Sequence, residues 1–316
     1  MLRGLGRIAA LTIVLAFAAG LVGCSQYGKL KAKQAFKDAN IVYAQQDYKK
    51  AAALYEEAIV QDPELSVAYF YLANSYDNLF KPSRKGEPEN DGYLAKAIEY
   101  YTKASEKEQD PTLRKRSFEF LVAAYGPDKM NDPSQQEPIV NRMIQLDPQD
   151  ATNYFALAKI REDAGDYEKA EEVLLQAKQA RPNDPQVYLQ LAGFYNRQEE
   201  FEKTIDALNQ RAAIEPNNPE AFYTISTYYW DKAYRDFRLK EPEKKEFVLK
   251  GIEQVDKALA LKADYMEALT YKNLLLRLQA NLEKDVAKQQ SLIKEADKLR
   301  DQAIELKKQK TAGVIK

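Results

Sequence analysis

Apolar and small residues return at a fixed spacing in the middle of the chain. Within residues 151–184 they fall three and four positions apart in two runs separated by a short polar break, as on one face of each of two α-helices. A shift of 34 residues brings this pattern onto residues 185–218. The matching positions are Tyr154, Leu157, Ala158, Tyr167, Ala170, Leu174, Ala177 and Pro182, then Tyr188, Leu191, Ala192, Phe201, Thr204, Leu208, Arg211 and Pro216. The spacing predicts repeated pairs of antiparallel helices, each pair ended by a proline.

Less regular copies flank these two units. We expect a first unit over residues 32–65, a second that opens at Tyr69, a third that opens at Phe118 and a sixth that opens at Phe222. In the third unit Gln136 stands where a small residue belongs. Extra chain falls between the two helices of a unit in three places, namely Asp77–Gly92, Gly126–Pro133 and Asp231–Glu246. Because these turns share one edge of a helix stack, insertions there favour a binding edge, although surface turns also tolerate added length at little cost.

The pattern resembles the tetratricopeptide repeat family, over roughly residues 32–280. The resemblance implies an all-α fold, a right-handed solenoid of helix–turn–helix units over residues 31–280, with about six units and a following helix, Tyr265–Ala280. An amphipathic stretch through Leu292, Ala296, Leu299, Ala303 and Leu306 lacks the repeat signature. We interpret residues 281–316 as a capping helix with a frayed tail.

The amino terminus has the layout of a secretory signal peptide over residues 1–23. Arg3 and Arg7 precede an uncharged, largely apolar run over residues 8–23, which is shorter than the ~20 residues that a spanning helix needs. The run ends in Leu21-Val22-Gly23-Cys24, which resembles the bacterial lipobox. That resemblance implies acylation of Cys24, a lipidated tether over residues 24–30 and a place in the cell envelope. The alternative is an uncleaved signal anchor with an incidental cysteine.

By the same resemblance, Ser25 after the cysteine suggests sorting to the outer membrane, facing the periplasm, in an organism that has one. Acyl chains contribute ~0.8 kcal/mol for each buried methylene, and stable anchoring takes two chains or more. A helical pattern begins near Leu30, so we expect the first helices close to the bilayer surface.

Composition narrows the possible chemistry. The 47 basic and 48 acidic side chains nearly cancel, which argues against a general nucleic-acid binder. The chain has no histidine and a single cysteine, so it lacks the commonest general base and cannot form an internal disulfide. Residues 87–92 only faintly resemble a calcium loop, because Ile98 stands at the position of the bidentate glutamate. We therefore expect no catalytic residue, no metal and no cofactor, and a protein that is not an enzyme.

The resemblance to the tetratricopeptide family implies partner contacts on the concave surface, at positions 2, 5, 9, 12 and 13 of the first helix of each unit. These positions hold Phe70, Asn74, Asp77, Phe155, Lys159, Glu162, Leu189, Asn196, Arg197, Tyr223, Thr227 and Trp230. Aromatic anchors with polar neighbours suit an extended peptide or a partner helix. Alternatively, some of these aromatic residues simply pack between helices. The leading hypothesis is a lipid-anchored scaffold that binds or assembles other envelope proteins, and the alternative is a glycan-binding or exopolysaccharide-export lipoprotein.

Overall fold

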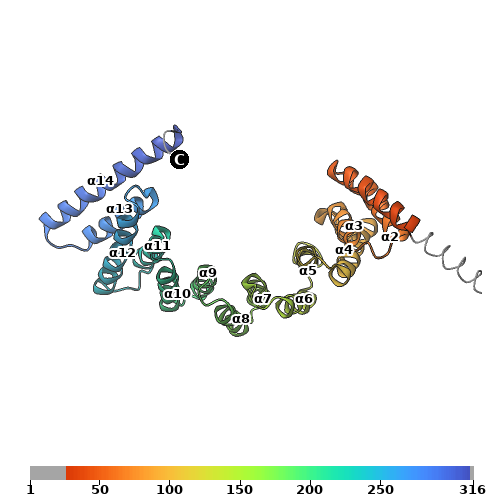
Figure 1. The fold of residues 1–316 in the computed structure, drawn as a ribbon. Helices are drawn as coiled ribbons and strands as arrows, with labels where there is room; N and C mark the ends of the chain where they lie inside the picture. The colour runs from red at the N-terminus through yellow and green to blue at the C-terminus, as the bar shows by residue number, and fades with distance from the viewer. Residues whose placement is uncertain (1–25, 314–316) are drawn as a thin grey trace, which may run out of the picture. The chain divides into compact units, whose positions relative to one another are not determined.

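The computed structural model describes residues 26–313, and none of these residues is in a β-strand. The predicted all-α fold is therefore confirmed over this range. The chain divides into two compact units, residues 1–166 and residues 167–316. Both consist of consecutive helices that fold back on one another as hairpins (Figure 1). The predicted signal peptide, Cys24 and the last residues of the predicted tail lie outside the described residues.

The first unit begins with a helix over residues 26–44, which we call the N-terminal helix. It continues with α2 (Tyr48–Gln61), α3 (Ser66–Leu79), the short 3₁₀ helix η1 (Pro82–Arg84), α4 (Pro88–Lys107), α5 (Pro111–Ala124), α6 (Pro133–Leu146) and α7 (Ala151–Asp163). Its main core combines small and aromatic side chains at the repeat positions, including Ala39, Ala51, Tyr55, Leu72 and Tyr101. The small residues let the helices approach closely, and the aromatic rings fill the seams between them.

The second unit contains α8 (Tyr167–Ala180), α9 (Pro185–Arg197), α10 (Phe201–Ile214), α11 (Pro219–Arg235), α12 (Glu241–Leu261), α13 (Met266–Asn281) and α14 (Val286–Thr311). Neighbouring helices pack as pairs, and α11 also packs on α13, the first helix of the following pair. Helix α14 packs along α13, so the predicted capping helix pairs with the helix before it (Figure 1).

Several helices that open a hairpin begin with a capping residue followed by proline. Asp184 accepts a hydrogen bond from the backbone N–H of Gln186 at 3.0 Å, and Asn218 accepts one from that of Glu220 at 3.0 Å. Each cap satisfies a backbone donor that has no partner inside the helix, and the proline that follows already has a helical φ. The proline pattern in the sequence thus fixes where these helices begin.

A tyrosine hydroxyl links successive hairpins in a recurring way. Tyr188 donates to the carbonyl of Pro182 at 2.6 Å, Tyr154 to that of Pro148 at 3.1 Å, and Tyr69 to that of Pro63 at 3.0 Å. The donor is the bulky residue at position 4 of a first helix, and the acceptor is the proline that ended the preceding hairpin. The spacing of six residues thus recurs in three places, and each bond ties the start of one hairpin to the end of the hairpin before it.

Two of the three stretches of extra chain, Asp77–Gly92 and Asp231–Glu246, are mostly helical. Helix α3 runs to Leu79 and α4 starts at Pro88, so the connection is shorter than the predicted Asp77–Gly92. Helix α11 runs to Arg235 and α12 starts at Glu241, well inside Asp231–Glu246. Much of the extra chain lengthens α4, α11 and α12, because its charged residues are good helix formers and prolines occupy the first turn of α4 and α12.

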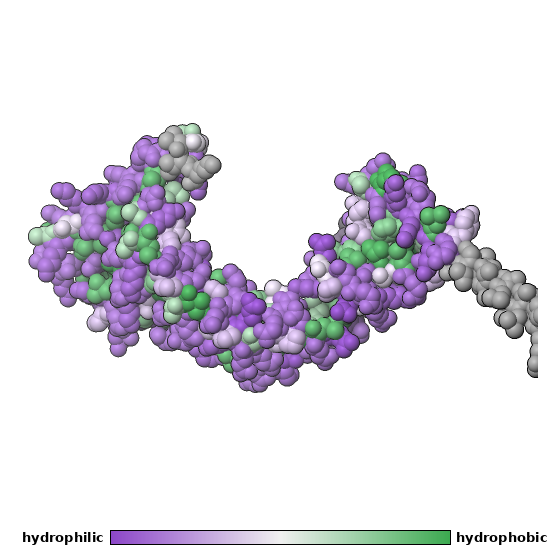
Figure 2. Space-filling view, in the orientation of Figure 1, coloured by the Kyte–Doolittle hydropathy of each residue, from purple (hydrophilic) through white to green (hydrophobic). Residues whose placement is uncertain are grey.

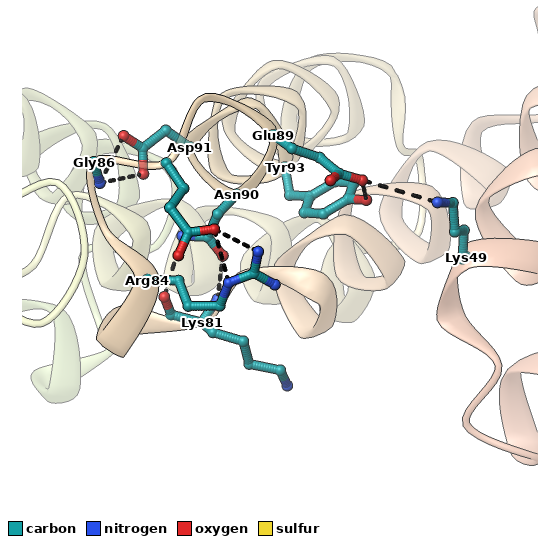
Figure 3. A network of polar contacts seen from close by, with 9 residues as sticks. Lys49, Lys81, Arg84, Gly86, Glu89, Asn90, Asp91 and Tyr93 are labelled. Carbon is teal, nitrogen blue, oxygen red and sulfur yellow. Dashed lines mark hydrogen bonds and ion pairs between the residues drawn. The ribbon is translucent and has the colours of Figure 1, made fainter.

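The connection between α3 and α4 is held by polar contacts (Figure 3). Asn90 is 2% exposed and bonds both backbone groups of Lys81, accepting from its N–H at 2.8 Å and donating to its carbonyl at 3.1 Å. The Asp91 carboxylate accepts from the N–H of Gly86 at 3.0 Å, at a φ of 98° that favours glycine. The connection is therefore a fixed part of the hairpin.

Candidate functional site

Four aromatic side chains form a cluster on the first helices of the second unit. Tyr271 of α13 lies edge-on to two residues of α11, with ring centroids 5.4 Å from Tyr223 and 5.6 Å from Trp230. Trp230 also stacks on Tyr234, at 4.9 Å and an interplanar angle of 11°. We call Tyr223, Trp230, Tyr234 and Tyr271 the aromatic cluster.

Helix geometry explains why these residues meet. Tyr223, Thr227, Trp230 and Tyr234 are spaced by four, three and four residues, so they lie along one stripe of α11, and α13 packs beside it. Tyr223 and Trp230 are half-buried and Tyr234 is exposed. Burial, followed by the neighbouring Tyr271 and Tyr265, raises the pKa of Tyr223 to about 12. The cluster is thus anchored by its neighbours at one end and open to solvent at the other.

A hollow of about 340 Å³ adjoins the cluster at Tyr223 and Tyr271. Met266 and Thr270 of α13 line it together with Arg300 and Ile304 of α14. Its walls are mainly apolar, and cationic groups stand at its edge. A hollow of this kind suits an apolar side chain that belongs to a segment carrying a polar or acidic group.

A larger groove, of about 570 Å³, lies where the end of α9 meets α11 and the connection to α12. Asn196, Tyr228 and Phe201 line it, and Phe237 at its edge is 92% exposed. Its charged residues pair with one another, as in the contact of Arg235 with Asp231 at 2.7 Å. Hydrogen bonds from Arg238 and Lys232 hold the pKa of Asp236 well below its usual range.

In the first unit, several predicted contact residues are interior. Phe70 is buried, with its ring 5.8 Å from that of Phe120. The buried Asn74 accepts a hydrogen bond from Tyr43 and donates to the Tyr101 hydroxyl at 3.1 Å. These side chains belong to the core. Residues of neighbouring helices cover them here, although the repeat family exposes the same positions to a partner.

Asp77 extends this buried network. It forms an ion pair with Lys129 of the α5–α6 connection and accepts from Tyr101 at 3.5 Å. Burial is the largest cause that raises the pKa of Tyr101, and Asp77 raises it further. Asp77 therefore holds a connection in place, and little of its carboxylate reaches solvent.

The remaining predicted residues lie at or near the surface of their own helices. Phe155 of α7 and Leu189 of α9 are half-buried, and Lys159 is exposed and paired with Asp163. Glu162 is half-buried, whereas Asn196 and Arg197 are exposed at the end of α9. The half-buried Thr227 donates its hydroxyl to the carbonyl of Thr224 at 2.7 Å. Their contact with a partner stays a prediction.

Of the predicted residues, Tyr223, Thr227 and Trp230 share one face, while Asn196 lines the neighbouring groove. The sequence analysis missed Tyr234, which lies beyond the family's numbered positions because α11 is longer than a standard first helix. It also missed Tyr271, which belongs to the helix predicted over Tyr265–Ala280, beyond the six units that supplied the partner positions. Extending the periodicity of α11 by four residues would have found Tyr234.

Between residues 26 and 313 no three cysteine or acidic residues are grouped so that they could bind a metal ion. In the same range, no helix is both long enough and apolar enough to cross a bilayer.

Comparisons with known proteins bear on the fold. A sequence model of the tetratricopeptide repeat matches residues 131–192 and 163–226. A crystal structure of the C-terminal part of a tetratricopeptide repeat-containing protein from Cytophaga hutchinsonii aligns with 86% of this chain and 98% of its own, at 17% identity and a TM-score of 0.54. No curated protein matches the sequence.

Two further solved structures align with lower scores. MamA aligns with 65% of this chain and 99% of its own at 19% identity and a TM-score of 0.40. YrrB, described as a tetratricopeptide protein with an unusual peptide-binding site, aligns with 74% of this chain and 88% of its own at 16% identity and a TM-score of 0.30. The family match and the Cytophaga structure support one conclusion: residues 131–226 match the tetratricopeptide repeat, and the described part of the chain folds as an all-helical solenoid of that type.

Proposed function

We propose that this protein is a scaffold that binds a segment of a partner protein on the first-helix face of residues 167–316. We define this face by the aromatic cluster, its adjoining hollow and the groove at Asn196. The observation that carries the proposal is the cluster itself, in which half-buried rings lead from an apolar hollow at Tyr223 and Tyr271 to the exposed Tyr234 at the other end. Rigid aromatic side chains in partly desolvated positions supply most of the binding energy in protein interfaces.

The dimensions of the face suit a helix or an extended segment. The stripe from Tyr223 to Tyr234 covers three turns of α11, and a partner helix would contact it through residues three and four apart. Lys307 lines the hollow and forms no ion pair within the described residues, which favours a partner with an acidic residue near its apolar anchor. Arg300 is already paired with Asp297 and Asp301, and Glu267 also lines the hollow. The proposed role is binding without catalysis, as is typical of repeat solenoids.

The proposal includes a place in the cell envelope, with a lipid tether at Cys24. It is supported by the apolar run over residues 8–23 and by the cysteine that ends it. The helical fold is already established at residue 26, so a tether at Cys24 would hold the first unit close to the bilayer surface. Replacing Cys24 with Ser should release the protein from the membrane fraction. If the variant still pellets with membranes, the tether is wrong.

Binding of a glycan is the second candidate, and the stacked pair of Trp230 and Tyr234 is the feature that favours it. Sugars stack on exposed aromatic faces, and Trp230 is the only tryptophan, so its fluorescence reports on this one place. A shift in emission on adding cell-surface polysaccharide would favour the glycan role. No shift, together with capture of a protein, would favour the scaffold.

The test of the scaffold compares matched substitutions on the two sides of the second unit. Replacing Trp230 and Tyr271 with Leu should abolish capture of the partner from native envelopes, because both changes keep an apolar side chain but remove the rings. The control replaces the exposed Leu175 of α8 and Leu249 of α12 with Ser, on second helices. Equal loss in both variants, or no loss in the first, would contradict the proposal.

A further inference from the structure

The N-terminal helix is anchored to the first unit by one face. Ala32, Ala35 and Ala39 are buried, and the half-buried Phe36 lies 5.6 Å from the ring of Tyr55 in α2. The start of the helix is held closely as well, since a Cβ on Gly28 would lie 2.9 Å from the carbonyl oxygen of Gln61. Because this face is fixed, the residues on the opposite side must point away from the unit.

Apolar residues and lysines share that outward side. Tyr27 is 61% exposed and Leu30 is 66% exposed, within one turn of each other at the start of the helix. Lys29, Lys31 and Lys33 are exposed around them, and Lys37 is exposed one turn further on. We call Tyr27, Leu30 and these four lysines the basic face.

The charge of the basic face is not balanced within the described residues. Residues 26–37 contain four lysines and no acidic residue, and Asp38 is the first acid. None of the four lysines forms an ion pair with a residue between 26 and 313, although Lys31 lies 4.8 Å from the centroid of the Tyr27 ring. Several lysines of later helices are paired within their own helix, as Lys103 is with Glu99 at 2.6 Å.

We propose that the basic face lies on the surface of an anionic phospholipid bilayer. Lysines attract anionic headgroups, while tyrosine and leucine insert at the boundary of the acyl chains. The inference rests on the proposed tether at Cys24 and adds to it, because Cys24 lies only two residues before the helix. The tether would fix the distance from the membrane, and the basic face would fix the orientation of the first hairpin.

Vesicle binding by a chain without lipid tests the inference. The protein is residues 24–316 with Cys24→Ser, and the probes are vesicles of phosphatidylcholine alone and vesicles that also contain phosphatidylglycerol. We expect binding to the anionic vesicles that weakens as salt is added. A combined Lys29→Gln, Lys31→Gln and Lys33→Gln variant should bind about a hundredfold more weakly, at about fivefold for each lysine.

A matched variant controls for net charge. Lys288, Lys294 and Lys298 are exposed on α14 and form no ion pair within the described residues, so replacing these three with Gln makes the same change of charge elsewhere. This variant should bind like the parent. Equal weakening by the two sets, or a parent that does not bind anionic vesicles at low salt, would overturn the proposal. Circular dichroism confirms that each variant remains helical.

The apolar residues distinguish a bilayer from a soluble anionic partner. Leu30→Ser should weaken vesicle binding about tenfold, because a leucine side chain no longer leaves water. If the lysines matter and Leu30 does not, charge alone holds the face, and the proposal that it inserts at the boundary of the acyl chains is overturned. Since this chain carries no acyl group, the result does not depend on whether Cys24 is acylated in cells.

Discussion

Arg211 shows how a residue that departs from the repeat is accommodated. It stands at a position where the repeat favours a small side chain, yet it is 4% exposed. Its guanidinium contacts Glu215 at 2.8 Å and Glu220 of α11 at 3.4 Å, while its Nη1 has no hydrogen-bond partner in the described residues. The pairing links α10 to α11, and the sequence identified the departure but not the two carboxylates that compensate for it.

Replacing Arg211 and replacing Glu215 should affect the stability of the protein differently. Arg211→Met removes a buried charge and keeps most of the volume, so we expect stability within about 1 kcal/mol of the parent, or higher. Glu215→Ala leaves the guanidinium with less compensation and should cost about 1–3 kcal/mol. Thermal melting of both variants measures the difference. A larger loss for Arg211→Met than for Glu215→Ala would contradict this assignment.

The tyrosine–proline bonds between hairpins can be tested one at a time. Tyr188→Phe removes only the hydroxyl that donates to Pro182, so we expect a loss of about 0.5–1.5 kcal/mol. The matched control is Tyr234→Phe, because Tyr234 is exposed and its hydroxyl makes no bond to a described residue. Urea denaturation followed by circular dichroism compares the two. Equal stability of both variants would show that the recurring bond adds nothing.

At the scale of single residues, the sequence predicts burial better than it predicts polar contacts. Periodicity places Tyr55 and Leu72 in the core, as found. It does not predict that Asn74 bonds Tyr101 inside the first unit, or that Gln136 donates to the carbonyl of Val122 at 2.9 Å. That carbonyl is in the last turn of α5, where it lacks a partner within the helix. Such contacts depend on packing between residues far apart in the sequence.

At the scale of helices, the sequence predicts where a helix begins more accurately than where it ends next to a stretch of extra chain. Asp-Pro and Asn-Pro pairs mark the first residues of α9 and α11. The extra chain was interpreted as loops, but α4 has 20 residues and α12 has 21. Charged residues in these stretches are compatible with both loops and solvent-facing helix, and only packing against the partner helix distinguishes the two.

The α3–α4 connection should depend on Asn90 far more than on its charged residues. Asn90→Ala leaves both backbone groups of Lys81 without their partner, so we expect a loss of about 1–3 kcal/mol. The control is Arg84→Ala, which breaks the exposed ion pair with Glu87 and should leave stability nearly unchanged. Differential scanning calorimetry compares the two variants. A greater loss at Arg84 would refute the stated role of Asn90.

At the scale of the whole molecule, the titration of tyrosines sets the dependence of stability on pH. The chain has 21 tyrosines and no histidine, so we expect little change between about pH 6 and 9. Burial raises the pKa of several tyrosines, and that of Tyr223 rises from 10.0 to about 12. Folding therefore favours the neutral phenol. The stabilisation that comes from keeping the phenol neutral is complete below pH 10, and it is lost as the pH rises through the pKa of the phenol in the folded protein.

We accordingly expect melting temperatures to fall between pH 10 and 12, together with late ionisation of part of the tyrosines. Absorbance of tyrosinate and circular dichroism, recorded on the same samples, measure both changes. Phenols that all titrate near pH 10 while the protein stays folded would contradict the burial of these rings. Added salt should alter the result little, because desolvation is the main cause of the raised pKa.

The candidate site was predictable in part at this scale. The repeat positions identify Tyr223 and Trp230, because their spacing on one helix follows from the period alone. Tyr271 and the hollow beside α14 depend on how α13 and α14 pack, which the repeat signature does not cover. The first-unit positions were less informative, since Phe70 and Asn74 are covered by neighbouring side chains.

Site-specific photocrosslinking in living cells tests the scaffold most directly. A benzophenone amino acid replaces Tyr234 on the first-helix face, and in separate strains it replaces Leu175 or Leu249 on second helices of the same unit. We expect a discrete protein adduct from position 234 that is absent from positions 175 and 249. If all three positions give the same adducts, or position 234 gives none while the protein is folded and abundant, this face does not bind a partner protein.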